Sequence, residues 1–504
     1  MHKARSVVNA SFVLGEVSDF LFGQYFEPLG RCTHEGMYEP GHFSSDEDGW
    51  RMDVFELVRE MGITCFRYPG GNFTATYRWE DGVGPRAERP VRMEPAWLSI
   101  EDNSIGTNEY VEYVKRLGAE TLMCFNMGTR GVEEACDLVE YCNWPGGTYL
   151  SDLRRKHGYE SPHDIKYWCI GNEVEGEWQI AQRRPSDYSW LCKQVGKAIK
   201  RMDPNYQIIA SGTSGSGLSS FIEWDLEVLD EAYEYIDGLA FHCYTNRFET
   251  DTTLRYLAHT AKLDHDLSAI EGACRAIKAK KRSKKDIWLS LDEWNVQSFE
   301  MIHLQTDRPK RGIKPWMVHP PVLEQTYTME DALALGLQFI VFFKHCNSIK
   351  IACMSLLVNS LAPIMTEKGG PAWRQPTYFP FMHCSKYGRG EVLQTVIECE
   401  TYEDELHGTV PYVEAVMTKN ENNLTLFAVN KHDNFCDVVC ELQGFDGYKL
   451  VEHIVLSHDD LFAVNTAKDQ NNVAPRTSDN ASVDGGILQA RLDGYSWNVI
   501  RLVR

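Results

Sequence analysis

Apolar residues over the first three quarters of the chain gather in short runs that alternate with longer amphipathic segments. Runs of near-continuous apolar character are typical of parallel strands whose two faces are both covered by helices. The segments between them repeat their apolar residues with helical spacing, for example at 51–61, 107–118 and 329–345. Eight such strand–helix units predict an α/β fold, a (β/α)8 TIM barrel rather than an open sheet. The expected strands lie at 20–27, 63–70, 120–128, 165–173, 207–214, 235–244, 286–294 and 348–357.

The pattern changes after Pro376, where short stretches alternate apolar and polar residues and are joined by turns rich in Asn, Asp and Gly. This alternation predicts a C-terminal all-β sandwich domain of the jelly-roll type. We therefore expect a catalytic barrel over residues 17–380 and a β-sandwich over 381–504. A further apolar strand within residues 1–16 is expected to join the sandwich.

Composition and charge narrow the choice of partner and compartment. The 504 residues carry a formal charge of −21, which argues against nucleic acid because such binding relies on Lys and Arg. A run of about 18 apolar residues is absent, so no membrane partner is expected. The N-terminus lacks a signal-peptide pattern, and the 15 cysteines lie scattered in apolar segments without a CxxC pair. Reduced cysteines of this kind predict a cytoplasmic protein, and neither a metal nor another cofactor is expected.

Polar side chains stand where the expected strands end, and barrel enzymes carry their active residues at that end of the strands. A glutamate at a strand end often caps the next helix or holds a loop, so a single one proves little. Here several such side chains converge on one face of the barrel. The run SGTSGSG at 211–217 lacks the ending of a phosphate-binding loop and predicts a flexible barrel loop. The strand-end residues are Glu27, Arg67 followed by Asn72, Asn126, Asn172 with Glu173, His242 with Tyr244, and Glu293.

Two carboxylates that face one cavity without metal-ligand spacing suit glycoside hydrolysis. One carboxyl must keep its proton for the leaving oxygen, while the other stays ionised. We expect Arg67 and Tyr244 to favour the charged form of Glu293. An apolar contact with Trp178 would keep Glu173 protonated. The neighbouring Glu175 and Glu177 are expected in the following loop, either exposed to solvent or in contact with the rim of the site.

Five motifs together resemble glycoside hydrolase family 51, whose members are mainly α-L-arabinofuranosidases. They are FGQYFEPLGR (22–31), FRYPGGNF (66–73), WCIGNEVEGEWQIA (168–181), LDEWNV (291–296) and VNSLAPIMTEKGGPAWRQ (358–375), which span nearly the whole chain. The resemblance implies exo-acting release of terminal α-L-arabinofuranosyl residues from oligosaccharides. It also implies homo-oligomers, with hexamers among them.

The same resemblance implies a role for each matching residue. Glu173 is the general acid/base, Glu293 is the nucleophile, and Asn172 binds the 2-hydroxyl of the sugar. Glu27 and Asn72 hold furanose hydroxyls, while Tyr244 supports the nucleophile. Arg67 is a supporting partner of Glu293, and His242 is either supporting or structural. The implied mechanism is retaining double displacement, with the two carboxyl groups roughly 5 Å apart.

Two departures from the family pattern concern the sugar. The family usually reads FxEHLG where this chain has Pro28, and it places a sugar-contacting glutamine where this chain has Leu356. Losing that amide removes one hydrogen bond, worth about 0.5–1.5 kcal/mol. The pattern therefore leaves open the same mechanism on another furanoside, such as a β-D-galactofuranoside. A non-catalytic carbohydrate-binding relative is the third alternative.

Overall fold

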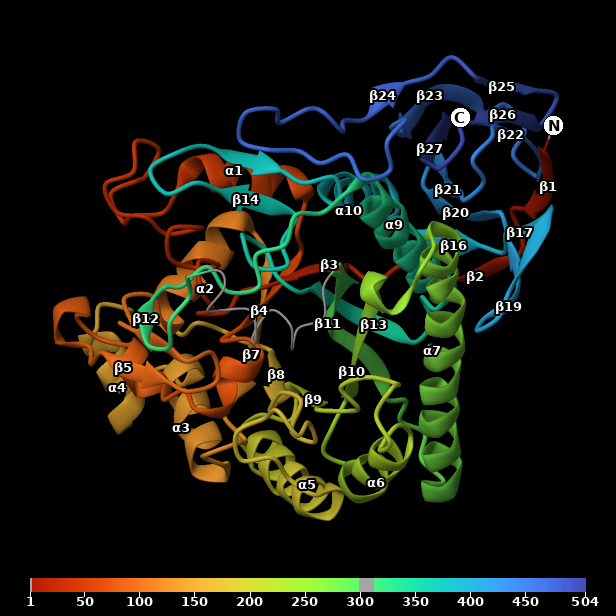
Figure 1. The fold of residues 1–504 in the computed structure, drawn as a ribbon. Coiled ribbons are helices and arrows are strands. Elements are labelled where there is room, and N and C mark those ends of the chain that lie inside the picture. Colours follow the sequence, from red (N-terminus) through yellow and green to blue (C-terminus); the bar gives the residue numbers. More distant parts are fainter. Residues whose placement is uncertain (1, 299–311) are drawn as a thin grey trace.

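Eight parallel strands close into a barrel, which confirms the predicted (β/α)8 fold (Figure 1). The computed structural model describes residues 2–298 and 312–504. All eight expected strands are present, with ends that differ by a few residues from the predicted ones. In chain order they are β3 (Phe20–Tyr25), β4 (Cys65–Tyr68), β7 (Glu120–Phe125), β8 (Tyr167–Ile170), β9 (Gln207–Ala210), β10 (Gly238–Asn246), β11 (Trp288–Gln297) and β13 (Ile349–Met354).

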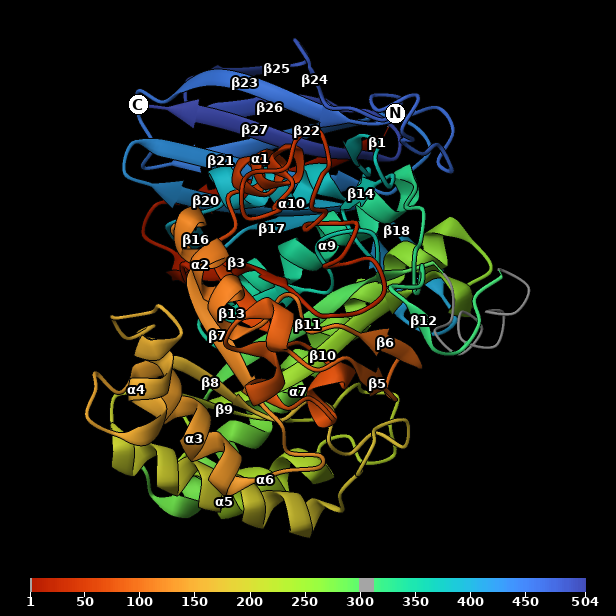
Figure 2. The ribbon, with the colours of Figure 1, turned by 90° about the vertical axis from the view of Figure 1, so that its left-hand side faces the viewer.

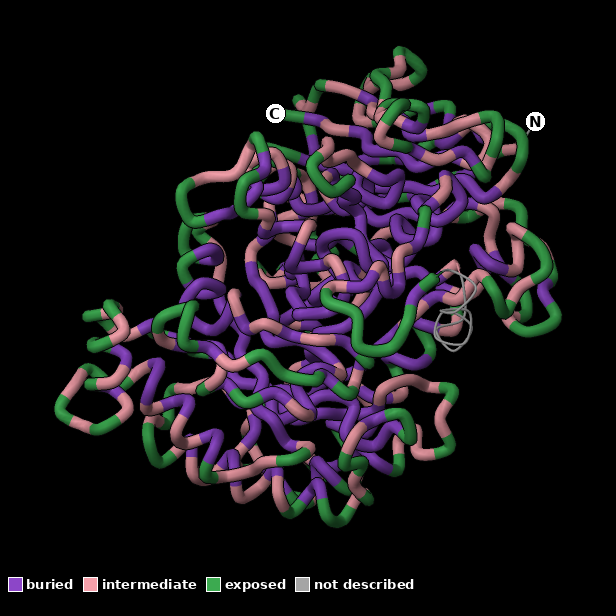
Figure 3. The backbone as a smooth tube through the Cα atoms, turned by 60° about the vertical axis from the view of Figure 1, so that its left-hand side comes forward, coloured by how far each residue is buried: buried purple, intermediate pink, exposed green. Residues whose placement is uncertain are grey.

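Helices surround the barrel (Figure 1), and the buried part of the backbone lies in the interior of the molecule (Figure 3). The helices predicted at 51–61, 107–118 and 329–345 are present as α1, α2 and α9. The helices are α1 (Met52–Met61), α2 (Thr107–Leu117), α3 (Val132–Asn143), α4 (Tyr149–Lys156), α5 (Pro185–Met202), α6 (Glu223–Ala232), α7 (Thr253–Lys281), α9 (Met329–Lys344) and α10 (Tyr378–Tyr387).

Two antiparallel-rich sheets stack at the other end of the molecule as the C-terminal sandwich (Figure 2). Apolar residues from both sheets form one core between them. One sheet contains β17 (Val396–Cys399), β1 (His2–Asn9), β22 (Cys436–Gln443), β26 (Ile487–Leu492) and β25 (Ala481–Asp484). The other contains β2 (Val13–Glu16), β16 (Glu391–Leu393), β20 (Val413–Asn420), β21 (Asn423–Asn430), β27 (Ser496–Val503), β23 (Lys449–Leu456) and β24 (Arg476–Thr477).

The outer face of the seven-stranded sheet packs on α9, which explains why that helix is buried on all sides. Residues 329–343 of α9 are buried throughout. Gly336 faces Trp497 of β27 so closely that an added Cβ would lie 2.6 Å from the indole ring, and only glycine fits there. Because α10 continues to Tyr387 and packs on α9, we propose that the barrel domain ends between α10 and β16.

Short sheets also lie outside the barrel and the two large sheets of the sandwich. β5 (Arg92–Glu94), β6 (Ser99–Glu101) and β12 (Met317–Val318) form a three-stranded sheet in the loops that follow the barrel strands. Two hairpins complete the strands, β14 (Ile364–Thr366) with β15 (Ala372–Arg374), and β18 (Thr401–Asp404) with β19 (Gly408–Pro411). Among the helices of residues 2–298 and 312–504, none is long and apolar enough to cross a membrane.

Candidate active site

The strand ends bring Glu173 and Glu293 together around His242. Glu173 follows β8 directly, while His242 in β10 pairs in register with Glu293 in β11. His242 Nδ1 lies 2.9 Å from Glu173 Oε1 and 3.7 Å from Glu293 Oε2. One carboxylate oxygen of each glutamate and one nitrogen of His242 all lie within 4.8 Å of one another. All three side chains are buried.

His242 carries a positive charge between these carboxylates. Burial alone would lower the pKa of this imidazole, but the charges of Glu293 and Glu173 and a hydrogen bond to Asp292 raise the pKa to about 10. Both ring nitrogens therefore donate, one to Glu173 and the other towards Asp292 at 3.3 Å. The sequence left the role of His242 open between supporting and structural. Its contacts place it beside both carboxylates.

Glu293 receives the expected hydrogen bonds but is also deeply buried. Tyr244 Oη donates to Oε1 at 2.6 Å, and Arg67 Nη1 donates to Oε2 at 3.3 Å. Burial and the charge of Glu173 nevertheless raise the pKa of Glu293, while His242, Arg67 and Tyr244 act to lower it. The predicted direction of the Arg67 and Tyr244 effects is thus right, but burial outweighs them.

Asp292 is a site residue that the sequence reasoning missed. Successive residues of a regular strand point to opposite faces, so Asp292 and Glu293 are not expected on one side. The pairing of β10 with β11 shifts register between Ala240 and His242, and such irregularities redirect side chains. Asp292 contacts both Arg67 Nε and His242 Nε2 at 3.3 Å. Burial would raise its pKa, but the Arg67 charge and His242 lower it overall.

Arg67 connects this cluster to the residue before the acid/base candidate. Its Nη2 donates to Asn172 Oδ1 at 2.6 Å, which fixes the amide so that its nitrogen is available as a donor. The amide of Asn172 then approaches Asn72 Oδ1 at 3.4 Å, and Gln179 Nε2 donates to the same oxygen at 2.9 Å. Asn72 and Asn172, to which the family resemblance assigns hydroxyl contacts, are therefore held close together.

Glu27 lies on the other side of the site, held by three donors. Tyr25 Oη donates to Oε2 at 2.7 Å, while Trp97 Nε1 and the Phe73 amide donate to Oε1 at 2.8 and 2.9 Å. Burial outweighs these bonds and raises the pKa of Glu27 to about 8. Trp97 was not found from the sequence, because it lies in the turn between β5 and β6, far from any strand end of the barrel.

Gly71 shows how tightly this side of the site is built. An added Cβ would lie 2.1 Å from Tyr25 Oη and 3.3 Å from Glu293 Oε2. A side chain at position 71 would therefore displace the tyrosine that supports Glu27 and reach the carboxylate of Glu293. The glycine pair in the motif YPGGN keeps this space free.

Two expectations about the segment after β8 are wrong. Trp178 does not give Glu173 a purely apolar neighbour, because its indole Nε1 donates to Glu173 Oε2 at 2.7 Å. Glu175 is not exposed. It is buried, and its carboxylate accepts hydrogen bonds from the Ser214 amide and from Ser220 Oγ. Glu177 is exposed, as expected.

The two departures from the family pattern are both buried. Pro28 lies in the buried segment that follows β3. Leu356 has an exposed fraction of 1% and is not among the described residues that line the active-site cavity. Gln297, at the end of β11, does line the cavity and offers an amide there. Nothing in the structure explains why leucine occupies position 356.

A cavity of about 570 Å³ opens over the catalytic cluster. It is lined by Glu173, Glu293, His242 and Tyr244, with Asn72 and Trp178 at its sides. This volume is typical of pockets that bind small organic ligands. The site combines a buried pair of carboxylates with amide and hydroxyl donors and an aromatic wall. This combination suits a neutral sugar.

Two groups of described residues place nitrogen and oxygen atoms close enough for a cation. In the active-site group, the charged His242 already stands between the carboxylates. The second group contains His34, Glu101, Asp102 and His319. Its two imidazole rings stack at 3.7 Å and 9°, so their in-plane lone pairs do not converge on one ion.

Comparisons with known proteins place these features in a family. Residues 57–262 match the family described as Alpha-L-arabinofuranosidase 1 domain, and residues 292–496 match the Alpha-L-arabinofuranosidase C-terminal domain. The chain is 46% identical to an intracellular exo-α-(1→5)-L-arabinofuranosidase of Halalkalibacterium halodurans, over 99% of both chains. It is 44% identical to intracellular exo-α-(1→5)-L-arabinofuranosidase 1 of Bacillus subtilis, over 100% of this chain and 99% of the relative.

A solved structure shows the same similarity in three dimensions. The family 51 α-L-arabinofuranosidase AbfB of Bifidobacterium longum superposes with a TM-score of 0.95 and 36% identity, over 100% of both chains. The similarity therefore covers the barrel and the sandwich together.

Proposed function

This chain belongs to the α-L-arabinofuranosidases of glycoside hydrolase family 51, and on that basis we propose how its site performs hydrolysis. The enzyme releases terminal α-L-arabinofuranosyl residues from oligosaccharides. Glu293 acts as the nucleophile and Glu173 as the acid/base in a double displacement. The observation that supports this assignment best is that one oxygen of Glu173 and one oxygen of Glu293 lie within 4.8 Å of each other. Inverting enzymes need about 6.5–9.5 Å between the two groups, so that a water molecule fits between them.

In the first step, Glu173 protonates the glycosidic oxygen while Glu293 attacks the anomeric carbon. The bond to the leaving sugar breaks, and an arabinosyl ester forms on Glu293. In the second step, Glu173 removes a proton from water, which attacks the same carbon and frees Glu293. His242 contacts both carboxylates, so its positive charge offsets their mutual repulsion when both are ionised.

The other site residues hold the arabinofuranose. Asn172 donates to the 2-hydroxyl, because Arg67 occupies its carbonyl oxygen. Glu27 and Asn72 bind the remaining hydroxyls, and Tyr244 orients Glu293. The protonated form of Glu27 that burial favours makes this carboxyl a donor as well as an acceptor at neutral pH.

The names of the relatives support finer proposals. We propose α-(1→5)-linked arabino-oligosaccharides as substrates and a location inside the cell. The arabinofuranosyl residue is favoured over the galactofuranosyl alternative for the same reason. A non-catalytic relative is disfavoured because both carboxylates and their partners are in place. Self-association, as hexamers or smaller oligomers, is proposed from the family resemblance, and light scattering measures it.

The test is a substrate panel that compares wild type with Glu293→Ala. Wild type should release arabinose from p-nitrophenyl α-L-arabinofuranoside and from α-(1→5)-arabinobiose, and the variant should release it from neither. Release from a galactofuranoside but not from either arabinoside would reject the proposed glycon. Undiminished turnover by the folded variant would reject Glu293 as nucleophile.

A further inference from the structure

The active-site cavity continues past the catalytic pair to a polar wall that the reaction described above does not use. Beyond Glu173 and Trp178 it is lined by the loop 214–217, which follows β9. It also reaches the first half of α7, where His259, Lys262 and Asp266 line it. The cavity is therefore larger than the space enclosed by the residues assigned to the arabinofuranose.

The position of this wall relates it to the leaving group. Glu27 and Gly71 lie on the side of Glu293, where the arabinofuranose is bound. The leaving oxygen must lie within hydrogen-bonding reach of Glu173, which protonates it. The cavity on the side of Glu173 and Trp178 is therefore where the rest of the oligosaccharide extends.

The loop 214–217 is anchored to the segment that carries the acid/base. Glu175 accepts a hydrogen bond from the Ser214 amide and another from Ser220 Oγ at 3.1 Å. The loop is thus fixed at both ends relative to Glu173. Lys262 Nζ on α7 donates to Ser216 Oγ between these anchors.

Two glycines in this loop leave space that no other described residue fills. An added Cβ on Gly215 or Gly217 would meet nothing within 4 Å, and neither residue has a left-handed φ. Neither close packing nor backbone conformation therefore requires glycine at these positions. Both glycines line the cavity, so a methyl group at either position is expected to reduce the space available to a ligand.

The side chains on α7 offer both donors and an acceptor. Lys262 Nζ donates to Asp266 Oδ2 at 2.6 Å as well as to Ser216, so one of its three N–H groups is left for a ligand. His259 is neutral at physiological pH, because burial lowers its pKa to about 4. Its Nδ1 accepts from the Asn246 amide, which puts the ring proton on Nε2 as a donor. The carboxylate of Asp266 disfavours an anionic ligand, so this wall suits a neutral polyol.

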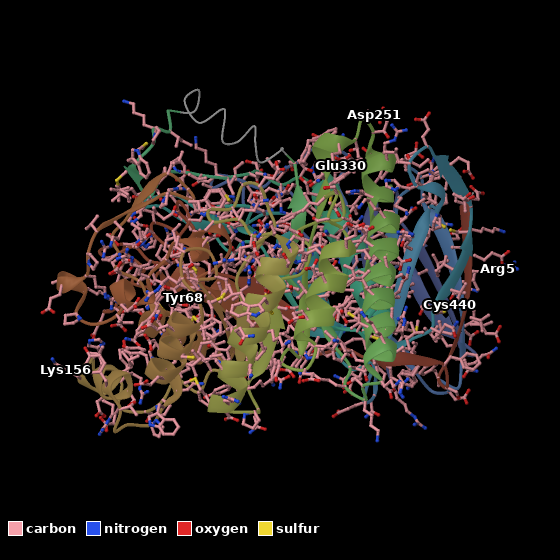
Figure 4. The ribbon with its side chains drawn as sticks, turned by 90° about the horizontal axis from the view of Figure 1, so that it is seen from below. Arg5, Tyr68, Lys156, Asp251, Glu330 and Cys440 are labelled. Atoms are coloured by element: carbon pink, nitrogen blue, oxygen red, sulfur yellow. The ribbon has the colours of Figure 1, made fainter. Side chains whose placement is uncertain are left out.

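The start of α7 is rigidly placed. Glu330, in the first turn of α9, accepts from Arg247 Nε at 2.7 Å and from Thr253 Oγ1 at 2.5 Å. Figure 4 labels Glu330 and Asp251, which comes just before α7, along the upper edge of the view. A preorganised wall loses little freedom when a ligand binds.

From these contacts we propose that Lys262 and Asp266 on α7, facing Gly215 and Gly217, form the subsite for the leaving sugar. This inference rests on the proposed hydrolysis of arabino-oligosaccharides. Lys262 donates to a hydroxyl of the leaving sugar, and the two glycines keep the space for its ring. Contacts in this subsite raise kcat/KM for natural oligosaccharides above the value that the reactivity of their glycosidic bond alone would give.

The test compares α-(1→5)-arabinobiose with p-nitrophenyl α-L-arabinofuranoside, whose aromatic leaving group offers no hydroxyls. For Lys262→Met, kcat/KM on arabinobiose should fall about tenfold more than kcat/KM on the aryl substrate, as expected for one hydrogen bond to a charged group. The control is Lys280→Met. Lys280 also lies on α7 and pairs with an aspartate, Asp230, at 2.9 Å, but it is exposed far from the cavity. This variant should behave as wild type on both substrates.

Gly217→Ala serves as a second variant, because it removes no contact of Lys262. It should raise the KM for arabinobiose, because the added methyl group takes space from the ring of the leaving sugar. Equal losses on both substrates, or no loss on either, in Lys262→Met would overturn the subsite, and so would an unchanged KM for arabinobiose in Gly217→Ala. If wild type released arabinose from neither substrate, the proposed function would fail instead, so the two failures are distinguishable.

Discussion

Replacing Tyr244 with Phe removes one hydrogen bond to the proposed nucleophile and leaves the ring in place. Tyr244 Oη donates to Glu293 Oε1 at 2.6 Å in a partly buried position. A hydrogen bond to a charged group contributes roughly 1.5–3 kcal/mol. Since each 1.36 kcal/mol changes a rate tenfold, the structure predicts a loss of about 10- to 150-fold.

This loss should fall mainly on the second step. Glu293 is neutral in the arabinosyl ester and regains its negative charge as the ester breaks down. The hydroxyl of Tyr244 therefore stabilises the transition state of that step more than it stabilises the intermediate. With an activated aryl arabinofuranoside, the intermediate should accumulate in Tyr244→Phe, so that kcat and KM fall together.

Stopped-flow measurement of nitrophenol release tests this reasoning. The variant should show a burst close to one equivalent of enzyme, followed by a slow steady state. A variant that retains wild-type kcat, or that loses kcat/KM as strongly as kcat without a burst, would refute the proposed role of Tyr244. Circular dichroism on the same sample controls for folding.

Three further predictions concern the acid/base, the sugar and a buried carboxyl. Glu173→Ala should lose most activity on substrates with poor leaving groups, and azide should restore turnover as arabinosyl azide; no azide product would remove Glu173 from its role. Leu356→Gln should leave the preference among furanosides unchanged, because Leu356 is not among the described residues that line the cavity; a changed preference in a substrate panel would show that position 356 does affect the sugar. Glu134 is buried, its Oε2 has no hydrogen-bond partner among the described residues, and burial raises its pKa from 4.5 to about 8. Between these values the folded state holds a proton that the unfolded state lacks, so stability falls as pH rises. Glu134→Gln should remove roughly 3–5 kcal/mol of this loss in the free energy of unfolding. Melting temperatures that drop equally for wild type and variant between pH 5 and pH 9 would contradict the prediction.

The sequence predicted the barrel well because its strands are buried on both faces. Such strands read as continuous apolar runs, and the polar residues that end them stand out. Glu173 was found in this way, since it comes three residues after the end of β8. Glu293 was also found, although β11 continues four residues beyond it, to Gln297. The family resemblance then supplied roles that strand ends alone do not give.

The residues that were missed depend on geometry that a sequence does not display. Asp292 joins the site because of an irregular strand pairing, whereas a regular strand would turn it away from Glu293. Trp97 reaches Glu27 from the turn between β5 and β6. Glu175 lies in a loop of polar residues, and its burial depends on Ser214 and Ser220 in a different loop.

The central claim is that Glu293 carries the sugar during turnover, and trapping the ester tests it most directly. Glu173→Ala should still form the ester from an aryl arabinofuranoside with a good leaving group, but it should break the ester down slowly. Mass spectrometry after rapid acid quenching should then find one pentosyl residue on the peptide that contains Glu293. A pentosyl residue on another carboxylate, or no labelled protein despite a burst of released phenol, would contradict the account.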